Sequence, residues 1–434
     1  MPEREGSPIL VPPDDRQQVT VRYATVPPSV TPAKIHQPVT GSHATAAGAR
    51  RSEGGSEPYA GSMTAAAPAP PPTAEQLISF SRGAPSLDIV DVAGLAGAAA
   101  RAFAADPAGV TAYGTSVGYP PLREWIATRH GVEVPQVLVT NGSMQADAFL
   151  FAHVLSAGDD VVVERPTYDR TLLRLTTLGA RVHPVTLQPD GIDVDELRKL
   201  LESGVRPRLV HIIPNFQNPA GATLSLGKRH ALLELAAEYG FTVFEDDPYA
   251  EIRFRGEALP SMLSLDRTAS VVHASSFTKT VCPGVRVGYL IGPADLISGI
   301  AERATNTYIS PGMVAQGIVY QFCISGDLER SVRTVRTALA RRVRLLGEAL
   351  RTHLPEARFT EPDGGYFLWV DLPDDVDAAA VFAAATSRRL AVVKGSDFLL
   401  EGGEHSLRLA YSAVPDDQID EGVRRLAAAV AATR

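Results

Sequence analysis

The stretch Ser275-Ser-Phe-Thr-Lys-Thr-Val-Cys-Pro-Gly-Val-Arg-Val-Gly-Tyr289 is the part of the sequence from which the fold and the chemistry of the chain are inferred. It places Lys279 on a loop after an apolar run, and lysine is the side chain that forms a Schiff base with a carbonyl group. Ser276, Thr278 and Arg286 supply hydroxyls and a guanidinium, a set suited to a phosphate dianion. A carbonyl and a phosphate on one ligand indicate pyridoxal 5′-phosphate (PLP). The alternative for this stretch alone is a loop lysine beside an unrelated serine and arginine.

The same stretch resembles the cofactor-lysine segment of fold-type I, class I/II aminotransferases, in which Ser-x-Ser/Thr-Lys is followed by Pro-Gly-x-Arg-x-Gly-Tyr. It is most similar to the branch that contains the 2-aminoadipate and kynurenine aminotransferases and the aminotransferase-like half of the MocR regulators. The resemblance extends from about Ser79 to the C-terminus. It implies a PLP-dependent aminotransferase that forms a homodimer and holds its cofactor on Lys279 as an internal aldimine.

Length and composition limit the class of protein. A chain of 434 residues is long enough for two or three packed units and a large core. Its formal net charge of −8 argues against a nucleic-acid-binding surface. The two cysteines, Cys282 and Cys323, cannot form a disulfide framework, so a reducing compartment is expected. No run approaches the roughly 20 apolar residues of a membrane helix, and no secretory pattern is found. We therefore expect a cytoplasmic protein without membrane or nucleic-acid partners, and no metal in its site.

Composition also divides the chain into segments. Residues 1–75 are rich in Pro, Ala, Gly, Ser and Thr, and their apolar residues are too sparse to offset the entropy of ordering, so we expect a disordered tail. An alternative is that translation starts at Met63. Residues 76–105 are expected to contribute to a small domain, residues 106–300 to form the large PLP-binding domain, and residues 301–434 to form the small C-terminal domain.

Strand-like apolar runs alternate with helix-like stretches in the middle of the chain. This alternation predicts an α/β fold with a mostly parallel sheet covered on both faces. The resemblance implies the fold-type I PLP-transferase version of it, and ligands in such folds bind at the carboxyl ends of the strands. The predicted strands are 137–140, 161–164, 182–187, 209–213, 241–245, 271–274 and 285–291, and the predicted helices are 90–105, 122–128, 146–155, 170–178, 194–201 and 227–239. A helix over 328–354 and strands within 364–371, 390–393 and 406–412 predict a small α+β domain at the C-terminus.

The turn Gly142-Ser-Met-Gln145 joins a predicted strand to a predicted helix. Free backbone N–H groups and the helix dipole favour an anion there, and Ser143 can add a hydroxyl. The alternative is a plain N-cap serine. Relatives use this turn to hold the PLP phosphate, so the resemblance implies that Ser143, Met144 and Gln145 bind the cofactor.

Three tyrosines and one asparagine take roles from the resemblance. Tyr168 matches the residue that stacks on the pyridine ring, and an aromatic side chain is suited to stack on a flat ring. Asn218, in an Asn-Pro-x-Gly turn, and Tyr249 match the residues that hydrogen-bond the 3′-oxygen of PLP. Tyr113 matches the tyrosine that reaches the cofactor phosphate of the partner subunit. A buried structural tyrosine is the alternative for Tyr113 and Tyr168.

The sequence Glu245-Asp-Asp247 contains three acids directly after an apolar strand, which is a costly arrangement unless the acids have partners or a function. PLP chemistry needs a protonated ring nitrogen, and a buried carboxylate keeps that nitrogen protonated. The family pattern Glu-Asp-Asp-Pro-Tyr gives this role to Asp246 and not to Asp247. The alternative is a chance acidic turn. Lys279, Asp246 and Tyr249 then form the expected catalytic set.

Arg408 lies in the middle of a predicted strand between two leucines, where an unpaired guanidinium would be costly. Its fork matches a carboxylate, and the family pattern makes it the arginine that binds the substrate α-carboxylate. The alternative is an internal ion pair. Gly83 resembles the loop on the substrate side of the pocket, with an ordinary turn as the alternative, and Asn218 is expected to contact substrate as well. Relatives carry a substrate-binding arginine in an N-terminal helix, for which only Arg82 is a loose candidate here.

The expected reaction moves an amino group between an L-amino acid and a 2-oxo acid, with 2-oxoglutarate as one partner. Lys279 would move a proton between Cα and C4′ as general base and acid. Two alternatives stay open: another PLP reaction at Cα, such as decarboxylation, elimination or cyclisation, and a non-catalytic PLP-binding sensor. Residues 1–75 are too poor in apolar periodicity for the DNA-binding domain of a MocR regulator, which disfavours the sensor. Neither the amino acid nor the pathway follows from the sequence.

Overall fold

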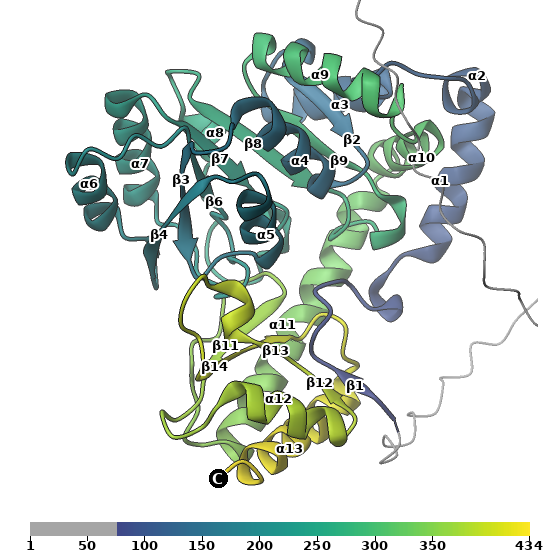
Figure 1. The fold of residues 1–434 in the computed structure, drawn as a ribbon. Coiled ribbons are helices and arrows are strands. Elements are labelled where there is room, and N and C mark those ends of the chain that lie inside the picture. The colour runs from purple at the N-terminus through teal and green to yellow at the C-terminus, as the bar shows by residue number, and fades with distance from the viewer. Residues whose placement is uncertain (1–75) are drawn as a thin grey trace, which may run out of the picture. The chain divides into compact units, whose positions relative to one another are not determined.

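The structure, a computed structural model, describes residues 76–434. The predicted tail over residues 1–75 and the alternative start at Met63 lie outside the described residues. Within residues 76–434, an eight-stranded sheet and a four-stranded sheet lie in two lobes, the large sheet in the upper part of Figure 1 and the small sheet in the lower part. The predicted fold class, α/β with a large mostly parallel sheet and a small α+β part, is confirmed.

The large sheet consists of β2 (Val137–Thr140), β9 (Gly288–Ile291), β8 (Val271–Ser276), β7 (Thr242–Asp246), β6 (Leu209–Ile212), β3 (Asp160–Arg165), β4 (Arg181–Gln188) and β5 (Gly191–Ile192), in this spatial order. The five strands from β8 to β4 are mutually parallel. β9 runs antiparallel to both of its neighbours, and β5 runs antiparallel to β4. The central strands are buried on both faces, as a parallel sheet requires.

Helices cover both faces of this sheet. They are α1 (Val92–Ala105), α2 (Pro107–Thr111), α3 (Pro120–His130), α4 (Ser143–Val154), α5 (Asp169–Thr177), α6 (Val194–Glu202), α7 (Leu226–Tyr239), α8 (Met262–Leu265), α9 (Ala294–Tyr308) and α10 (Met313–Ile324). α4, α5 and α9 share one apolar cluster with the strands, in which Phe151 packs against Phe244. α6, α7 and α8 pack on the opposite face, and α1, α3 and α10 pack around β2 and β9.

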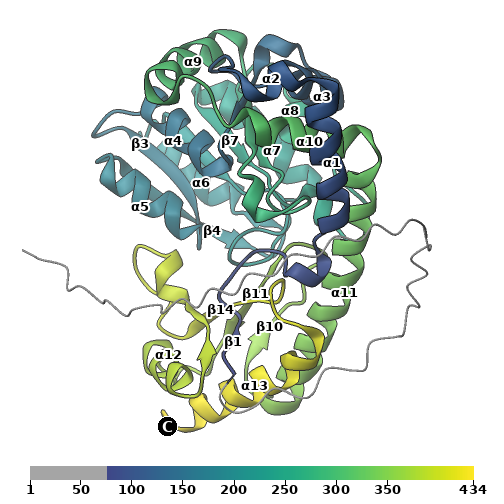
Figure 2. The ribbon, with the colours of Figure 1, turned by 90° about the vertical axis from the view of Figure 1, so that its right-hand side faces the viewer.

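The small sheet is antiparallel and consists of β10 (Arg358–Phe359), β11 (Phe367–Asp371), β14 (Ser406–Ala410) and β13 (Val393–Lys394), in this order. α11 (Asp327–His353), α12 (Ala378–Ser387) and α13 (Asp416–Ala431) accompany it. β1 (Ile78–Ser79) pairs in parallel with β12 (Leu390–Ala391), which brings the first described residues to the C-terminal part (Figure 2). α11 contributes to the apolar clusters of both parts and so connects them.

Two predicted strands are wrong in their limits. The predicted strand 285–291 begins only at Gly288, because Pro283–Val285 form a 3-10 turn and Arg286 follows with φ +49° and ψ +49°. Pro283 removes a backbone donor, and the left-handed conformation of Arg286 cannot continue a strand. The predicted strand 390–393 is divided, since β12 pairs with β1 whereas β13 pairs with β14. The other predicted strands and helices match observed elements, with ends displaced by a few residues.

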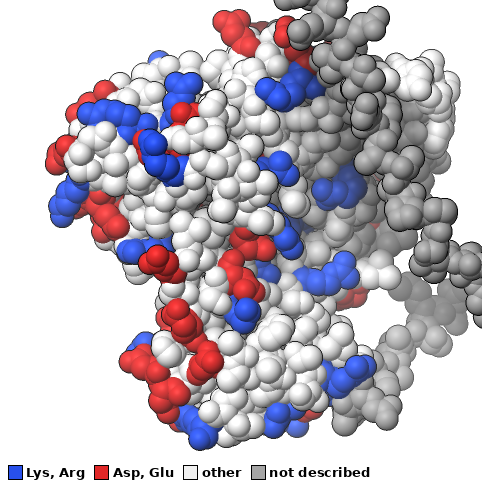
Figure 3. Space-filling view, viewed as in Figure 1, with Lys and Arg blue, Asp and Glu red and all other residues white. Residues whose placement is uncertain are grey.

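Charged side chains of both signs are interspersed on the face shown in Figure 3. None of the helices in residues 76–434 has the length and apolar character needed to cross a membrane. The same residues contain no group of three or more His, Cys, Asp and Glu side chains that could hold a metal ion. The polar groups that the fold does gather line a cavity at the edge of the large sheet.

Arg342 of α11 is a buried cation that ties together three segments of the chain. Its Nη2 donates to Asp88 at 2.5 Å, its Nε donates to Asp416 at 3.0 Å, and its Nη1 donates to Ser86 Oγ at 2.7 Å and to the Ser412 carbonyl at 2.8 Å. These bonds join the segment after β1, the start of α13 and the end of β14 to one helix. The position of residues 83–88, of which Gly83 lines the cavity, therefore depends on Arg342.

Replacing Arg342 with leucine is expected to lower the free energy of unfolding by about 2–3 kcal/mol, because the buried Ser412 carbonyl loses a charged donor and three further bonds of the guanidinium are removed. The measurement is urea unfolding followed by circular dichroism. The matched control is Arg341→Leu, since Arg341 also pairs with Asp416 but its side chain is 65% exposed. The control should change stability by under about 0.5 kcal/mol. Equal effects of the two substitutions would contradict the special role of Arg342.

Candidate active site

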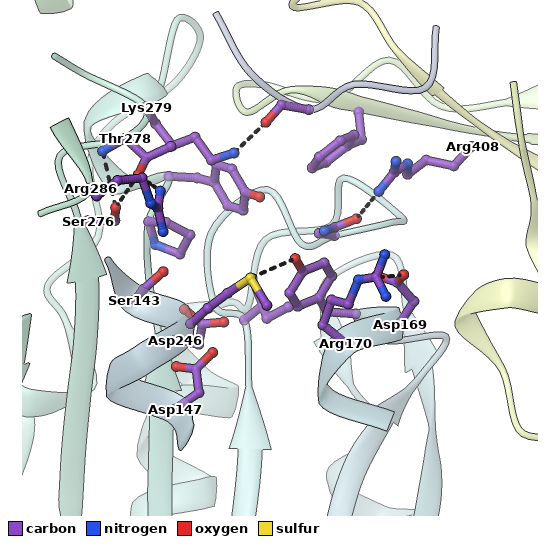
Figure 4. A pocket seen from close by; sticks show the side chains of 18 residues that line it. Ser143, Asp147, Asp169, Arg170, Asp246, Ser276, Thr278, Lys279, Arg286 and Arg408 are labelled. Atoms are coloured by element: carbon purple, nitrogen blue, oxygen red, sulfur yellow. Dashed lines mark hydrogen bonds and ion pairs between the residues drawn. The ribbon is translucent and has the colours of Figure 1, made fainter. Parts of the chain in front are cut away.

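A cavity of about 290 Å³ lies at the carboxyl ends of β3, β6, β7 and β8, where the small sheet faces the large one (Figure 4). Most of the residues singled out from the sequence line it. The lining consists of Gly83, Ser143, Met144, Asp147, Tyr168, Asp169, Arg170, Ile213, Asn218, Asp246, Pro248, Tyr249, Ser276, Thr278, Lys279, Arg286, Phe367 and Arg408. The structure therefore brings residues that lie far apart in the sequence, from Gly83 to Arg408, to one site.

Three candidates from the sequence do not line this cavity. The Gln145 side chain accepts a hydrogen bond from the Asn141 N–H at 2.9 Å and so fixes the turn before α4. Tyr113 is 87% exposed. Among residues 76–434, Arg82 offers only its carbonyl group, which accepts from Ser412 Oγ at 3.3 Å.

Lys279 lies in the turn that follows β8, and its amine points into the cavity (Figure 4). The amine donates to the Gly83 carbonyl and lies 5.5 and 5.1 Å from the ring centres of Tyr249 and Tyr366. Tyr366 Oη donates to the Lys279 carbonyl at 2.7 Å, which holds the turn. Burial, and then the nearby charge of Arg408, lower the pKa of Lys279 to about 8. The amine can therefore be neutral, and thus nucleophilic, near neutral pH.

One end of the cavity is suited to a dianion. Arg286 Nη1 lies 3.4 Å from Thr278 Oγ1, and Ser276 Oγ donates to Thr278 Oγ1 at 2.7 Å. α4 begins at Ser143, so its first backbone N–H groups point toward the same end. Among residues 76–434, no carboxylate forms an ion pair with Arg286. A cation, hydroxyls and a helix N-terminus fit the phosphate of PLP.

The close approach of β9 to this turn explains two glycines. A Cβ atom at Gly288 would lie 2.4 Å from the Ser143 backbone nitrogen, and one at Gly142 would lie 2.2 Å from Arg286 Nη2. Gly142 also has φ +87°, which favours glycine. The space for an anion therefore depends on these two glycines, which have no Cβ atom, as well as on the polar side chains around it.

The three consecutive acids at the end of β7, Glu245 to Asp247, have different environments. Glu245 accepts from His273 at 2.9 Å, and Asp247 accepts from Asn215 Nδ2 at 2.7 Å. Asp246 points instead into the cavity, with Oδ2 at 3.6 Å from His211 Nε2 and with Oδ1 buried and without a hydrogen-bond partner among the described residues. An unpartnered buried carboxylate oxygen at the cavity wall fits the protonated ring nitrogen of PLP.

Arg408 of β14 forms the opposite end of the cavity. Its guanidinium lies between the rings of Phe367 and Phe398, 4.4 and 4.7 Å from their centres. It donates to Asn218 Oδ1 at 3.0 Å and to the Ser81 carbonyl at 2.8 Å, while its Nε has no partner in the described part of the chain. No carboxylate of residues 76–434 pairs with it, so the alternative of an internal ion pair is wrong for these residues. Because Asn218 Oδ1 accepts from Arg408, the Asn218 amide N–H groups are directed elsewhere and can donate.

Sequence reasoning missed several lining residues, of which Asp147, Asp169 and Arg170 are ionisable. Asp147 lies four residues after Ser143, one turn along α4, and this spacing could have placed it on the same face of the helix. Asp169 and Arg170 directly follow Tyr168 at the start of α5. Phe367 also lines the cavity and explains Gly83, because a Cβ at position 83 would lie 2.2 Å from the Phe367 ring.

Comparison with known proteins agrees with this geometry. The sequence model of the family "Aminotransferase class I and II" matches residues 75–426. The 2-aminoadipate transaminase of Thermus thermophilus is 33% identical over 359 residues, which are 82% of this chain and 90% of that protein. Aromatic-amino-acid aminotransferase 1 of Thermococcus litoralis is 30% identical, over 73% of this chain and 78% of that protein.

Solved structures give the same result. The alpha-aminoadipate aminotransferase of Thermus thermophilus, complexed with N-(5′-phosphopyridoxyl)-L-leucine, has a TM-score of 0.79 and 32% identity, and the match covers 82% of this chain and 92% of that one. The Pyrococcus horikoshii kynurenine aminotransferase has a TM-score of 0.79 and 31% identity, covering 82% of this chain and 91% of that one. These relatives are named for transamination and do not favour the other PLP reactions or the sensor. The chain belongs to the class I and II aminotransferase family and is a PLP-dependent transaminase of fold type I.

Proposed function

We propose that this transaminase exchanges an amino group between an L-amino acid and a 2-oxo acid in the cavity around Lys279, with 2-oxoglutarate as one substrate. The observation that carries the proposal is that a half-buried amine and a buried guanidinium, neither with a carboxylate partner among the described residues, line one cavity. An amino acid brings the complementary groups, an amino group to be exchanged and an α-carboxylate to be bound.

The cofactor end of the cavity has a residue for each polar part of PLP. Ser276, Thr278 and Arg286, with the backbone and side chain of the turn at Ser143, bind the phosphate. The same turn includes Met144 and Gln145. When bound, PLP supplies an aldehyde and a protonated ring that accepts the electron pair released at Cα.

The ring itself is held by four residues that line the cavity. Asp246 keeps the proton on the ring nitrogen, and Tyr168 stacks on one face of the ring. Asn218 and Tyr249 donate hydrogen bonds to the 3′-oxygen. In this proposal Asn218 contacts both PLP and the substrate. Its Oδ1 accepts from Arg408, so it lies beside the group proposed to bind the substrate α-carboxylate.

At the reacting end, Arg408 binds the substrate α-carboxylate, and the N-terminal segment with Gly83 covers the substrate. Lys279 accepts the proton from Cα and delivers it to C4′, acting as general base and then as general acid. Its lowered pKa suits both roles near neutral pH. The stacked rings of Phe367 and Phe398 shield Arg408 from water, which strengthens its attraction for a carboxylate.

We further propose a cytoplasmic homodimer in which Tyr113 of the partner subunit completes each phosphate site. The exposure of Tyr113, and the exposed apolar side chains of Phe103 and Val314 on α1 and α10, support this. The free cysteines, Cys282 and Cys323, fit a reducing compartment.

Arg170 supports a dicarboxylic substrate such as 2-oxoglutarate. Its guanidinium lies at the same end of the cavity as Arg408, with Nε at 3.5 Å from Asp169 Oδ2 (Figure 4). A cation in the first turn of α5 is disfavoured by the helix dipole, so helix stability does not explain it. Two guanidinium groups at one end of the cavity match the two carboxylates of a dicarboxylate. The amino donor stays open, since the relatives include aminoadipate, aromatic and kynurenine enzymes.

Replacing Lys279 with alanine is expected to abolish the visible absorbance of bound PLP and to lower amino-acid-dependent 2-oxo acid formation by roughly a thousandfold. The measurement is a spectrum of the purified protein with a panel of amino acids added singly, followed by product analysis. Lys199→Ala, on exposed α6, is the control and should match the wild type. Turnover retained by Lys279→Ala would refute the proposal.

The rate at which cofactor-free protein captures PLP should rise with pH up to about 8 and then level off. An amine attacks an aldehyde only when it is neutral, and burial lowers the pKa of Lys279 from its usual 10.5 to about 8. Below pH 8 the protonated amine predominates and is unreactive; above pH 8 the neutral amine predominates. Stopped-flow absorbance across this range tests the prediction, and a rate that keeps rising toward 10.5 would contradict it.

Replacing Arg170 with glutamine is expected to raise the KM for 2-oxoglutarate about five- to tenfold, because an exposed charge pair contributes roughly 1 kcal/mol. The KM for pyruvate, which lacks the second carboxylate, should stay within a factor of about two. Steady-state kinetics with both acceptors measures this. The control is Arg198→Gln, an exposed arginine that pairs with Glu238 on the far helices. A parallel change for both acceptors would count against the role of Arg170.

A further inference from the structure

Asp147 is a buried carboxyl group on the apolar face of a helix. It lies on α4 at the spacing i, i+3, i+4 with Leu150 and Phe151, which pack against the large sheet. The residue is 7% exposed, and its Oδ1 has no hydrogen-bond partner among the described residues. A carboxyl group at such a position is costly unless it is paired or protonated. Nothing in the packing of α4 requires it.

Asp147 and Asp246 line the same cavity and come from two elements that pack against each other, α4 and β7. Asp246 lies on the same face of β7 as Phe244, the face on which α4 packs, and Figure 4 shows the two labelled carboxyl groups one above the other. Each of them has a buried oxygen without a partner, Oδ1 in both residues. Two ionised carboxylates repel each other and both can only accept hydrogen bonds. A proton on one of them removes the repulsion and turns that group into a donor for the other.

The surrounding charges assign the proton to Asp147. Asp246 faces the space proposed for the protonated ring nitrogen, which would partner its negative charge, and its Oδ2 lies 3.6 Å from His211 Nε2 of β6. Asp147 has no ion pair within the described residues, and only the exposed Arg174 of α5 contributes a favourable charge. Burial, and then the charge of Asp246, raise the pKa of Asp147 well above its usual value.

The other titratable groups packed around Asp147 and Asp246 do not take over the proton assigned to Asp147. Glu164 of β3 is also buried, and burial raises its pKa to about 8, but it already accepts from the Ile213 N–H and from Gln217 Nε2, both at 3.1 Å. Tyr168 lies on the cavity side, where burial raises its pKa to about 12, so it stays neutral. Lys279 enters the same cavity from the turn after β8.

We propose that Asp147 is a positioning residue that stays protonated and donates its O–H group to Asp246. This inference rests on the proposed role of Asp246 toward the ring nitrogen. The neutral acid fixes the orientation of the Asp246 carboxylate and leaves a single negative charge at the ring end of the cavity. A leucine of similar size would fill the same space but could not orient Asp246.

Infrared difference spectroscopy of the cofactor-free protein tests the protonation state without any enzymatic readout. The wild type minus Asp147→Asn spectrum at neutral pH should contain the carbonyl band of a protonated carboxyl group, and this band should survive to a pH well above the usual aspartate value of about 3.9. Carboxylate bands in its place would mean that Asp147 is ionised, and would overturn the proposal.

Cofactor affinity of the full chain tests the positioning role. Asp147→Leu should weaken PLP binding roughly ten- to a hundredfold, the loss of one hydrogen bond to a charged group. Asp147→Asn keeps a donor and should weaken binding only a few-fold, with an unchanged midpoint in the pH dependence of the visible absorbance.

The outcomes separate this inference from the proposed function. Equal PLP affinity in the leucine variant and the wild type, or an asparagine variant whose absorbance midpoint shifts as far as that of Asp246→Asn, would overturn the role of Asp147. If Asp246→Asn itself leaves PLP affinity and the absorbance midpoint unchanged, the proposed role of Asp246 fails first. The infrared result stands independently of either. If Asp147→Leu does not fold, the asparagine variant and its infrared spectrum still decide the question.

Discussion

The desolvation of charged groups at the carboxyl edge of the large sheet is the constraint on which the rest of the structure depends. Asp246 and Arg408 are buried and Lys279 is half-buried around one cavity, and neither Lys279 nor Arg408 has an ion-pair partner in residues 76–434. Buried groups of this kind are unfavourable unless the surrounding fold holds them in place. The energy comes from apolar clusters on both faces of the sheet, which fix the strand ends from which these groups project.

The neighbours of each group limit its freedom without neutralising it. The Gly83 carbonyl and two tyrosine rings surround the Lys279 amine, and the Tyr366 hydroxyl holds its backbone. Two phenylalanine rings and two oxygen acceptors surround Arg408, which leaves its Nε without a partner among the described residues. Such surroundings orient a side chain and exclude water, yet leave its chemistry available to a ligand. A site assembled in this way is preorganised, and little reorganisation is needed when a charged ligand binds.

Much of this could be predicted from the sequence because it depends on local patterns. Alternating apolar runs and helices predicted the parallel sheet, and polar residues at the strand ends predicted the cavity. The residues expected to bind the cofactor around Lys279 were taken from family motifs. The wrong limits of the strand at 285–291 have a local cause, the turn at Pro283 and the left-handed Arg286, which an apolar pattern does not reveal. Asp147 and Arg170 were missed because their roles depend on which face of a helix packs against which strand, and no sequence motif shows this packing. The predicted contact of Tyr113 lies in a partner subunit and stays a prediction.

The acids at positions 245 to 247 show how the same chemical group acquires different functions from the pleat of one strand. Successive side chains of a strand point to opposite faces, so Asp246 points toward α4 while Glu245 and Asp247 point toward the other face. There Glu245 meets His273 and two backbone N–H groups, and Asp247 meets Asn215. Both are satisfied by the protein and can be understood as structural. Asp246 alone of the three reaches the cavity with an oxygen that the described residues do not satisfy, and a ligand or a neighbouring acid must complete its environment. The alternation of the strand thus separates Asp246, which we propose to contact the cofactor, from Glu245 and Asp247, whose partners lie within the protein.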